Sequence, residues 1–233
     1  MSIEKTMRSN GKPQARKRYF LMTIIIILGS ILIYYTVVTI HARLNTKKIV
    51  TSILDSDTIR LRLSDLTPRQ LYILLLVEDP EFLHHKGVDL KTPGAGLTTI
   101  TQALVKLLYF ENFKPGIRKL KQTLIARFAL DPIVSKEDQL LLFINIFGFR
   151  YDTKGFSEAS QFYYGKQFTR LNEEEYISIV AMMIGCSTYN IKHNPEANAD
   201  RSERISKLIN GEYVPKKMSD IYYEDTKSAF RVK

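Results

Sequence analysis

The sequence is poor in cysteine and histidine, two of the side chains that most often cross-link small domains or bind metals. It contains one cysteine, Cys186, so no disulfide can form within the chain and a cysteine-rich zinc site is excluded. The four histidines are His41, His84, His85 and His193. His84 and His85 are adjacent, so on a helix they cannot face one ligand together. We therefore expect no metal site built from the chain's own residues.

Acidic side chains are also in deficit. Asp and Glu number 24 against 34 Lys and Arg, which gives a net charge of +10 and a pI near 9.5. This excess favours anionic partners such as nucleic acid, anionic lipid or a phosphate-bearing substrate. Apolar residues make up 45% of the 233 residues, which excludes disorder by composition. The length suits one domain with attachments or two small domains.

Charge is absent from one long apolar stretch, residues 19–40, which reads YFLMTIIIILGSILIYYTVVTI. A transmembrane helix needs about 20 apolar residues. The apolar part of a signal peptide is shorter, about 7–15 residues, and ends in a small-residue cleavage site that is missing here. The stretch therefore predicts a transmembrane helix and membrane lipids as partners. Nucleic-acid binding would explain the charge but not this span, so we expect no nucleic-acid partner.

The cations around this span predict its orientation. Six precede it, namely Lys5, Arg8, Lys12, Arg16, Lys17 and Arg18, with only Glu4 opposing them. Three follow it closely, namely Arg43, Lys47 and Lys48. The positive-inside rule then makes residues 1–18 a cytoplasmic basic tail. No later segment matches the span in length. We expect a single-pass protein of the inner or plasma membrane, with residues from about 41 onward on the periplasmic or extracellular side.

The outer part is expected to be mainly α-helical. Residues 41–66 form a polar connector, 67–215 one domain, and 216–233 a polar and loosely held tail. Pairs typical of helix starts are Thr67 with Gln70, Ser135 with Asp138, and Asn172 with Glu175. Helices are expected over 67–77, 98–108, 117–130, 135–147 and 172–185. Strand signals are scarce.

Glu78 is the candidate general base. It ends a very apolar helix, with Leu75, Leu76 and Phe82 nearby. A carboxylate against apolar walls has a raised pKa, and such groups serve as bases near neutrality. Asp79 could orient its neighbours or cap the following turn. The alternative is that Glu78 is a solvated acid at a helix end.

Two downstream features could hold a phosphate. Three threonines follow a glycine-bearing loop at a helix start, where free backbone N–H groups suit anions: Thr98, Thr99 and Thr101. Four cations crowd one short stretch: Lys114, Arg118, Lys119 and Lys121. Both features also have an explanation without a ligand. Threonine is a good N-cap, and a basic run is often a solvated helix face.

Taken in order, several segments resemble the motifs of peptidoglycan glycosyltransferase family 51. This family comprises monofunctional transglycosylases and the transglycosylase domains of class A penicillin-binding proteins. The matching segments are EDPEFLHHKGVD (78–89), LTTITQALVK (97–106), IRKLKQ (117–122), KEDQLLLFIN (136–145), GFSEASQFYYGK (155–166) and YNIKHNPEANADR (189–201). The resemblance covers about residues 70–209, and its TITQ and ASQxYYGK blocks are specific.

The resemblance implies a mainly α-helical, lysozyme-like domain with a membrane-embedded jaw. It implies polymerisation of lipid II into glycan strands, with Glu78 as the base, inversion at the donor sugar and release of undecaprenyl pyrophosphate. The substrate-binding residues it implies are Asp79, Thr98, Thr99, Gln102, Lys106, Arg118, Lys119, Gln122, Asn145 and Arg201. A divalent cation, Mg²⁺ or Mn²⁺, could accompany the pyrophosphate. Expected partners are lipid II, the growing glycan strand and other cell-wall synthesis proteins.

The sequence departs from the family pattern at several positions. Gln122 and Leu141 stand where the third and fourth motifs usually have Glu, and Leu97, Thr98 and Ala103 replace residues of the second motif. A second hypothesis is therefore a non-catalytic relative that binds lipid II or glycan. A third is a lytic enzyme on the related fold, which the membrane span and the motif order disfavour. Only 18 residues follow residue 215, so we expect no transpeptidase domain there.

Overall fold

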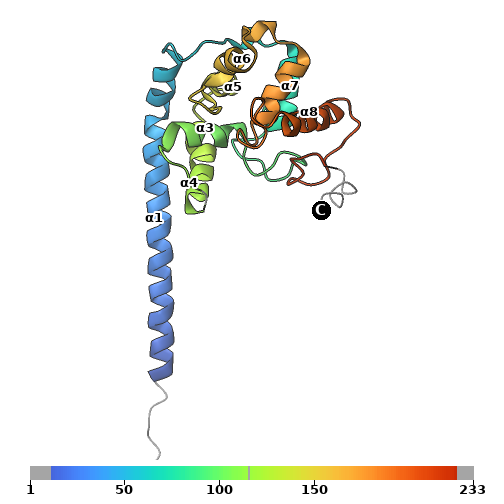
Figure 1. The fold of residues 1–233 in the computed structure, drawn as a ribbon. Helices are drawn as coiled ribbons and strands as arrows, with labels where there is room; N and C mark the ends of the chain where they lie inside the picture. The colour runs from blue at the N-terminus through green and yellow to red at the C-terminus, as the bar shows by residue number, and fades with distance from the viewer. Residues whose placement is uncertain (1–11, 115, 225–233) are drawn as a thin grey trace, which may run out of the picture.

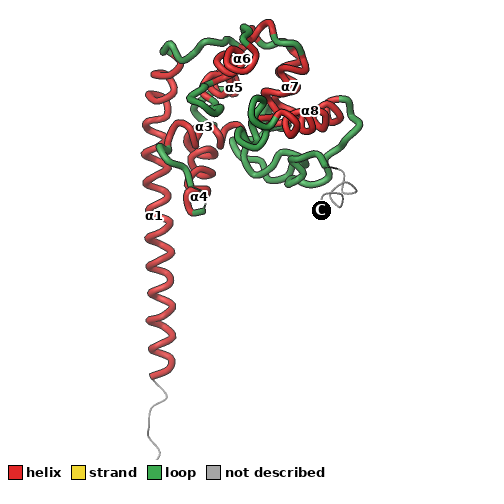
Figure 2. Tube along the Cα trace, in the orientation of Figure 1, coloured by secondary structure: helices red, strands yellow, loops and turns green. Residues whose placement is uncertain are grey.

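The computed structural model describes residues 12–114 and 116–224 and is drawn in Figure 1. Within these ranges the chain is helical apart from loops and one isolated bridge between Gly148 and Lys154 (Figure 2). This confirms the expectation of a mainly α-helical, lysozyme-like domain behind one long N-terminal helix. The expected cytoplasmic tail, 1–18, lies mostly outside the described residues.

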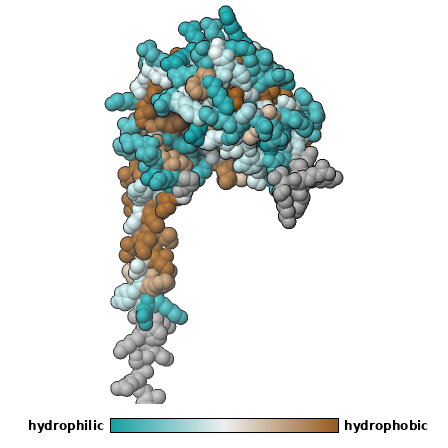
Figure 3. Space-filling view, viewed as in Figure 1, coloured by the Kyte–Doolittle hydropathy of each residue, from teal (hydrophilic) through white to brown (hydrophobic). Residues whose placement is uncertain are grey.

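Helix α1 (Lys12–Leu54) is the long apolar helix. Its 43 residues extend about 65 Å, roughly twice the thickness of a hydrocarbon core. Its most apolar window of 18 residues is not buried against any part of the described chain, and Figure 3 shows this part as an apolar stalk below the domain. The helix also does not stop at Ile40, because 41–54, the first part of the expected connector, continues it.

The upper part of α1 packs on the domain. Ala42 and Thr46 are buried, and the Thr46 hydroxyl lies 2.6 Å from the hydroxyl of Tyr109. The Arg43 guanidinium donates a hydrogen bond of 2.6 Å to the carbonyl of Phe128. Side-chain packing therefore joins the anchor to the domain, in addition to the chain connection.

The domain itself contains seven further α-helices among the described residues. They are α2 (Pro68–Glu78), α3 (Ile100–Tyr109), α4 (Ile117–Ile125), α5 (Lys136–Ile146), α6 (Gly155–Tyr164), α7 (Glu173–Met182) and α8 (Pro195–Ile209). The short elements are η1 (Leu63–Asp65), the π-helical η2 (Ala126–Leu130) and η3 (Phe168–Arg170). The segment 117–130, expected as one helix, is thus α4 followed by η2.

The three expected helix starts are confirmed. Thr67 with Gln70 and Asn172 with Glu175 form complete capping boxes. The Ser135 hydroxyl accepts a hydrogen bond from the backbone N–H of Asp138. Each cap satisfies N–H groups that lack partners inside the helix.

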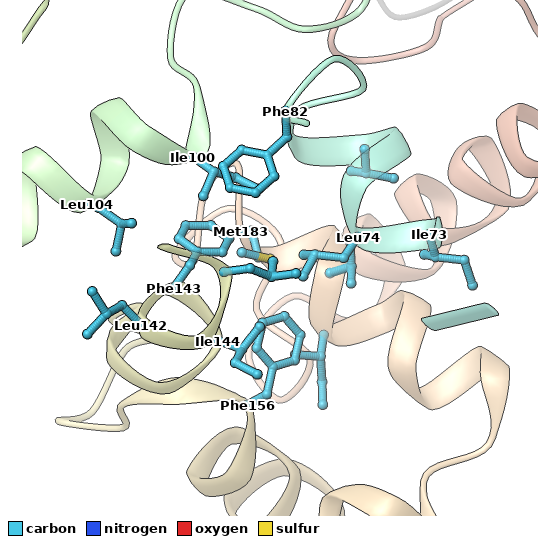
Figure 4. Close-up of a cluster of buried hydrophobic side chains, with 14 of the residues drawn as sticks. Ile73, Leu74, Phe82, Ile100, Leu104, Leu142, Phe143, Ile144, Phe156 and Met183 are labelled. Atoms are coloured by element: carbon cyan, nitrogen blue, oxygen red, sulfur yellow. The ribbon is translucent and has the colours of Figure 1, made fainter. Parts of the chain in front are cut away.

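The core lies where α2, α3, α5, α6 and α7 meet, as Figure 4 shows. Ile73 and Leu74 of α2, Phe143 of α5 and Phe156 of α6 are almost completely buried. Met183, at the end of α7, points into the same cluster. This packing fixes the C-terminal end of α2, and with it Glu78, beside the start of α3.

The expectation of a loose tail after residue 215 is wrong for 216–224. This segment folds back onto the domain, where Gly94 donates its N–H to the carbonyl of Lys217 at 2.9 Å. Tyr223 is only 3% exposed, and its hydroxyl donates to the carbonyl of Val77 at 3.1 Å. Val77 lies in the last turn of α2, whose carbonyls have no partner within the helix. The expected tail beyond 224 lies outside the described residues.

We predict that Tyr223→Phe destabilises the protein by about 1 kcal/mol, because it removes this buried hydrogen bond and keeps the packed ring. Thermal unfolding of the detergent-solubilised chain should show a drop of about 2–4 °C. The matched control is Tyr222→Phe, since Tyr222 is 46% exposed. Equal unfolding temperatures for the two variants would contradict the role of Tyr223.

Candidate functional site

A cavity of about 430 Å³ opens where the end of α2, the loop before α3 and the C-terminal segment meet. Glu78 lines it from α2, and Lys106 from α3. Arg201 of α8 and Thr98 of the loop complete its polar lining together with Thr99. Phe143, Phe147 and Met183 contribute apolar walls. The cavity therefore combines one carboxyl group, two cationic side chains and hydroxyl groups with apolar walls.

Glu78 is half-buried in this cavity. Burial raises the pKa of its carboxyl to about 7, since the charged form loses solvation. The positive charge of Arg201 opposes this rise, and the negative charge of Asp79 adds to it. The carboxyl is thus poised to gain and lose a proton near neutral pH.

Arg201 is the fixed positive charge opposite Glu78. Its side chain is 1% exposed and donates to the carbonyls of Ala181 and Ile221, both at 3.1 Å. Its guanidinium also lies 5.6 Å from the centre of the Tyr223 ring. Burial lowers the pKa of Arg201, and the nearby Tyr223 and Glu78 counteract this effect. Because these contacts hold the guanidinium, it supplies a preorganised charge at the cavity.

Asp79 is turned into the protein and not into the cavity. Its buried carboxylate accepts from the backbone N–H of Ile100 and from Nε2 of His85, each at 2.9 Å. Nδ1 of His85 accepts from the N–H of Gly87 at 3.1 Å, so a neutral His85 carries its proton on Nε2. The expected orienting role of Asp79 therefore has a structural basis, because it joins the end of α2 to the start of α3.

Lys106 lines the cavity, and Lys119 of α4 lies close enough to form a cation pair with it. The Nζ of Lys119 donates to the hydroxyl of Thr98 at 2.8 Å. Burial lowers the pKa of Lys119, and the positive charge of Lys106 lowers it further. Neither lysine has a carboxylate partner within the described part of the chain. An anion between them would relieve this repulsion.

Three of the expected substrate-binding residues form a buried network at the α3–α4 interface. Thr99 and Gln102 form the capping box of α3, so the N-cap is Thr99 and not Thr98. The amide of Gln122 is 1% exposed and donates to the carbonyl of Gln102 at 2.6 Å. Of the three, only Thr99 lines the cavity.

Two further expected residues lie away from the cavity. Arg118 is exposed and donates to the carbonyl of Asn112. Asn145 is buried, and its Oδ1 accepts from the N–H groups of Arg60 and Leu61 at 2.9 Å. Asn145 therefore fastens α5 to the segment before η1.

Sequence reasoning missed the contribution of the C-terminal segment. Ser219 and Ile221 line the cavity, and Tyr223 contacts Arg201 there. The available signal was an apolar and aromatic group, Ile221, Tyr222 and Tyr223, within a stretch treated as polar. Such a group has a hydrophobic reason to return to the domain.

Comparisons with known proteins agree with this arrangement. Residues 46–210 match the family model described as Transglycosylase. The chain is 30% identical over 149 residues to penicillin-binding protein 1F of Bacillus subtilis (strain 168), which covers 58% of this chain and 21% of that protein. It is 31% identical over 169 residues to penicillin-binding protein 1B of Buchnera aphidicola subsp. Acyrthosiphon pisum (strain APS), covering 65% and 22%.

A shorter relative matches over more of its own length. The biosynthetic peptidoglycan transglycosylase of Acinetobacter baumannii (strain ATCC 17978) is 27% identical over 164 residues, 65% of this chain and 72% of that protein. The chain thus spans about a fifth of the length of the penicillin-binding proteins above. The family match covers most of the domain and includes every charged residue of the cavity. The chain belongs to the transglycosylase family.

Proposed function

We propose that the protein is a membrane-anchored peptidoglycan glycosyltransferase that polymerises lipid II and releases undecaprenyl pyrophosphate. Family membership and the similarity to a biosynthetic peptidoglycan transglycosylase support the reaction class. The observation that carries the proposal is one cavity lined by Glu78 and Lys106, with Lys119 beside it, bound to the lining residue Thr98. A base is needed for the acceptor sugar, and cations are needed for a diphosphate leaving group.

In this mechanism the Glu78 carboxylate takes the proton from the 4-hydroxyl of the acceptor N-acetylglucosamine. The freed oxygen forms a bond to the anomeric carbon of the donor N-acetylmuramic acid, with inversion. The bond from that carbon to the pyrophosphate oxygen breaks, and the leaving group keeps the electron pair. Lys106 and Lys119 stabilise the charge that develops on the pyrophosphate. A pKa of about 7 makes Glu78 an effective base near neutral pH.

Arg201 has a different role in this proposal. Its guanidinium is buried and held by two backbone carbonyls, so it is not free to follow a leaving group. It acts on Glu78, because its charge limits the rise in the pKa of that carboxyl. Without this charge the pKa of Glu78 would rise further, and less of the carboxyl would be deprotonated and able to accept a proton at neutral pH.

The expected divalent cation finds little support among the chain's own groups. The described residues contain no cluster of three His, Cys, Asp or Glu that could hold a metal ion. Position 122, where the family pattern has a carboxylate, is a buried glutamine that donates to a backbone carbonyl. We therefore propose that Mg²⁺ or Mn²⁺, if used, binds through the oxygens of the pyrophosphate itself, and we assign it no step.

A second candidate function is lipid II or glycan binding without catalysis, in partnership with other cell-wall synthesis proteins. The observation that favours it is the Gln122 side chain. It carries no charge, and its Oε1 has no hydrogen-bond partner among the described residues. Leu141 packs against the core where the fourth motif usually has a Glu. If the protein is an enzyme, Glu78 must perform the acid–base chemistry without a second acid. The effect of replacing Glu78 on polymerisation therefore separates the two candidates.

We predict that Glu78→Gln lowers lipid II polymerisation at least about 100-fold, because a positioned base contributes about 10²–10⁴-fold. The assay uses labelled lipid II and detergent-solubilised protein, with and without Mg²⁺ or Mn²⁺. The wild-type rate should rise with pH through about 7, since only the deprotonated Glu78 accepts a proton. Glu81→Gln is the matched control, because Glu81 is an exposed acid of the same segment.

Two outcomes would overturn this assignment in different ways. An unchanged polymerisation rate in Glu78→Gln would show that Glu78 is not the base. Lipid II binding by the wild type with no polymer under any metal or detergent condition would move the protein to the non-catalytic candidate.

Lys119 and Arg118 offer a direct test of the pyrophosphate site, because they are adjacent in sequence and differ in placement. Lys119→Ala should weaken lipid II binding about tenfold or more, as expected for a lost charge-assisted contact. Arg118→Ala should change it less than threefold, since its guanidinium is already bound to the Asn112 carbonyl. Equal losses in the two variants, measured by direct binding of labelled lipid II, would contradict the proposed site.

The orientation of the anchor is also part of the proposal. The cations before residue 19 favour a cytoplasmic N-terminus, which would place the domain outside the cytoplasm. A C-terminal alkaline phosphatase fusion should then be active in cells, and a C-terminal green fluorescent protein fusion dark. A fluorescent fusion with an inactive phosphatase would reverse this topology.

A further inference from the structure

A second cavity, of about 630 Å³, lies at the α6 end of the domain. Figure 1 shows α6 at the end of the domain remote from the apolar part of α1. The loop 151–153, α6 and the segment 166–169 form most of its wall. It shares no lining residue with the Glu78 cavity. Its chemistry can therefore be considered separately from that of the first site.

Exposed aromatic rings form one wall of this second cavity. Tyr151 is 50% exposed and stacks on Phe162, with ring centres 5.8 Å apart and planes inclined by 22°. Tyr151 and the next residue, Asp152, have φ values of 61° and 54°. Left-handed backbone is uncommon for residues other than glycine, and two in succession persist only where the surroundings hold them. Here strained backbone accompanies a half-exposed aromatic ring, which also contacts the Arg150 guanidinium at 5.7 Å and the His193 ring at 5.3 Å.

The other walls are polar, and several of their side chains are available to form hydrogen bonds with a ligand. Gln161, Gln167 and Thr169 line the cavity, and their side chains make no hydrogen bond within the described ranges. An amide side chain both donates and accepts, as does a hydroxyl. These groups can therefore match a ligand that is itself rich in hydroxyl groups.

The charges of the lining argue against an anionic ligand. The two cations that line this cavity are Arg60 and Lys166. Arg60 is paired with Glu158 at 2.7 Å, and Lys166 with Glu175 at 2.5 Å. Neither is free to bind a phosphate or a carboxylate without breaking an ion pair. This is the opposite of the Lys106–Lys119 pair at the first cavity.

We propose that the second cavity is a carbohydrate-binding site that takes an uncharged pyranose unit of a glycan chain. The C–H face of a pyranose packs on the exposed part of the Tyr151 ring, next to Phe162. Its hydroxyl groups exchange hydrogen bonds with Gln161, Gln167 and Thr169. The volume lies within the range of ligand pockets. The proposal does not rest on catalysis at Glu78, because it concerns binding alone.

The test is binding of chitotetraose, an uncharged chain of four N-acetylglucosamine units, to the full chain. The protein is kept in a detergent without a sugar head group, so that the detergent cannot compete. Ligand-observed NMR titration should show saturable binding, and Tyr151→Ala should weaken it at least about tenfold, since the stacking ring is lost. Tyr151→Phe, which keeps the ring, should bind like the wild type. Gln161→Ala should also weaken binding.

Two controls separate this site from other parts of the protein. Tyr222→Ala removes an equally exposed tyrosine elsewhere and should leave the affinity unchanged. Lys119→Ala alters the first cavity and should also leave it unchanged. Equal affinity of wild type and Tyr151→Ala, or a loss confined to Lys119→Ala, would overturn the proposal. So would the absence of chitotetraose binding at millimolar concentration. A protein that binds chitotetraose through Tyr151 but makes no polymer would leave this inference standing and the proposed catalysis refuted.

Discussion

The Glu78 carboxyl facing the buried Arg201 guanidinium is the interaction on which the rest of the site depends. Burial alone disfavours the carboxylate, and the fixed positive charge of Arg201 restores part of its stability, which leaves a pKa of about 7. Two other contacts hold the surroundings of this pair. Asp79 ties the end of α2 to Ile100, and Tyr223 binds the last turn of α2 through Val77. Contacts to the start of α3 and to the C-terminal segment thus hold the end of α2 that carries Glu78.

The anchoring helix imposes the second constraint. Because α1 runs on into the domain and packs beside α4 and η2, the two cation-bearing helices α3 and α4 stand close to the anchor (Figure 1). Lys106 and Lys119 are carried on these helices. In the proposed function, a substrate with a lipid tail and a diphosphate would meet these cations near the membrane surface, with its sugar units reaching toward Glu78. The proposed carbohydrate site at α6 lies further from the membrane.

The sequence predicts the parts of this structure that depend on local chemistry. The capping pairs at Thr67 and Asn172 predict the starts of their helices. In a capping box the side chains bond backbone N–H groups only three residues away, so the signal lies in the local sequence. Glu78 was recognisable for a similar reason, since its apolar neighbours are adjacent in sequence. The parts that depend on distant contacts were not predictable. Gln122 turns inward to the Gln102 carbonyl, and Arg118 turns outward, although the resemblance implied that both bind substrate.

Continuation of α1 past Ile40 had a weak signal in the sequence. Ala42, Thr46 and Val50 recur at a spacing of four and are all buried, which is the stripe of a helix packed on one side. Because the residues between them are mostly polar, the segment 41–54 was predicted to be part of a polar connector.

The titration of Glu78 itself tests the pairing of this carboxyl with Arg201. Carbon-13 NMR of the full chain labelled at glutamate carboxyl groups would follow each acid, with Glu78→Gln to assign the signal. Burial of Glu78 beside Arg201 predicts a midpoint of about 7 for this carboxyl. A midpoint near 4.5, the value of an unperturbed glutamate, would show that the carboxyl is solvated and would contradict its role as a base poised near neutral pH.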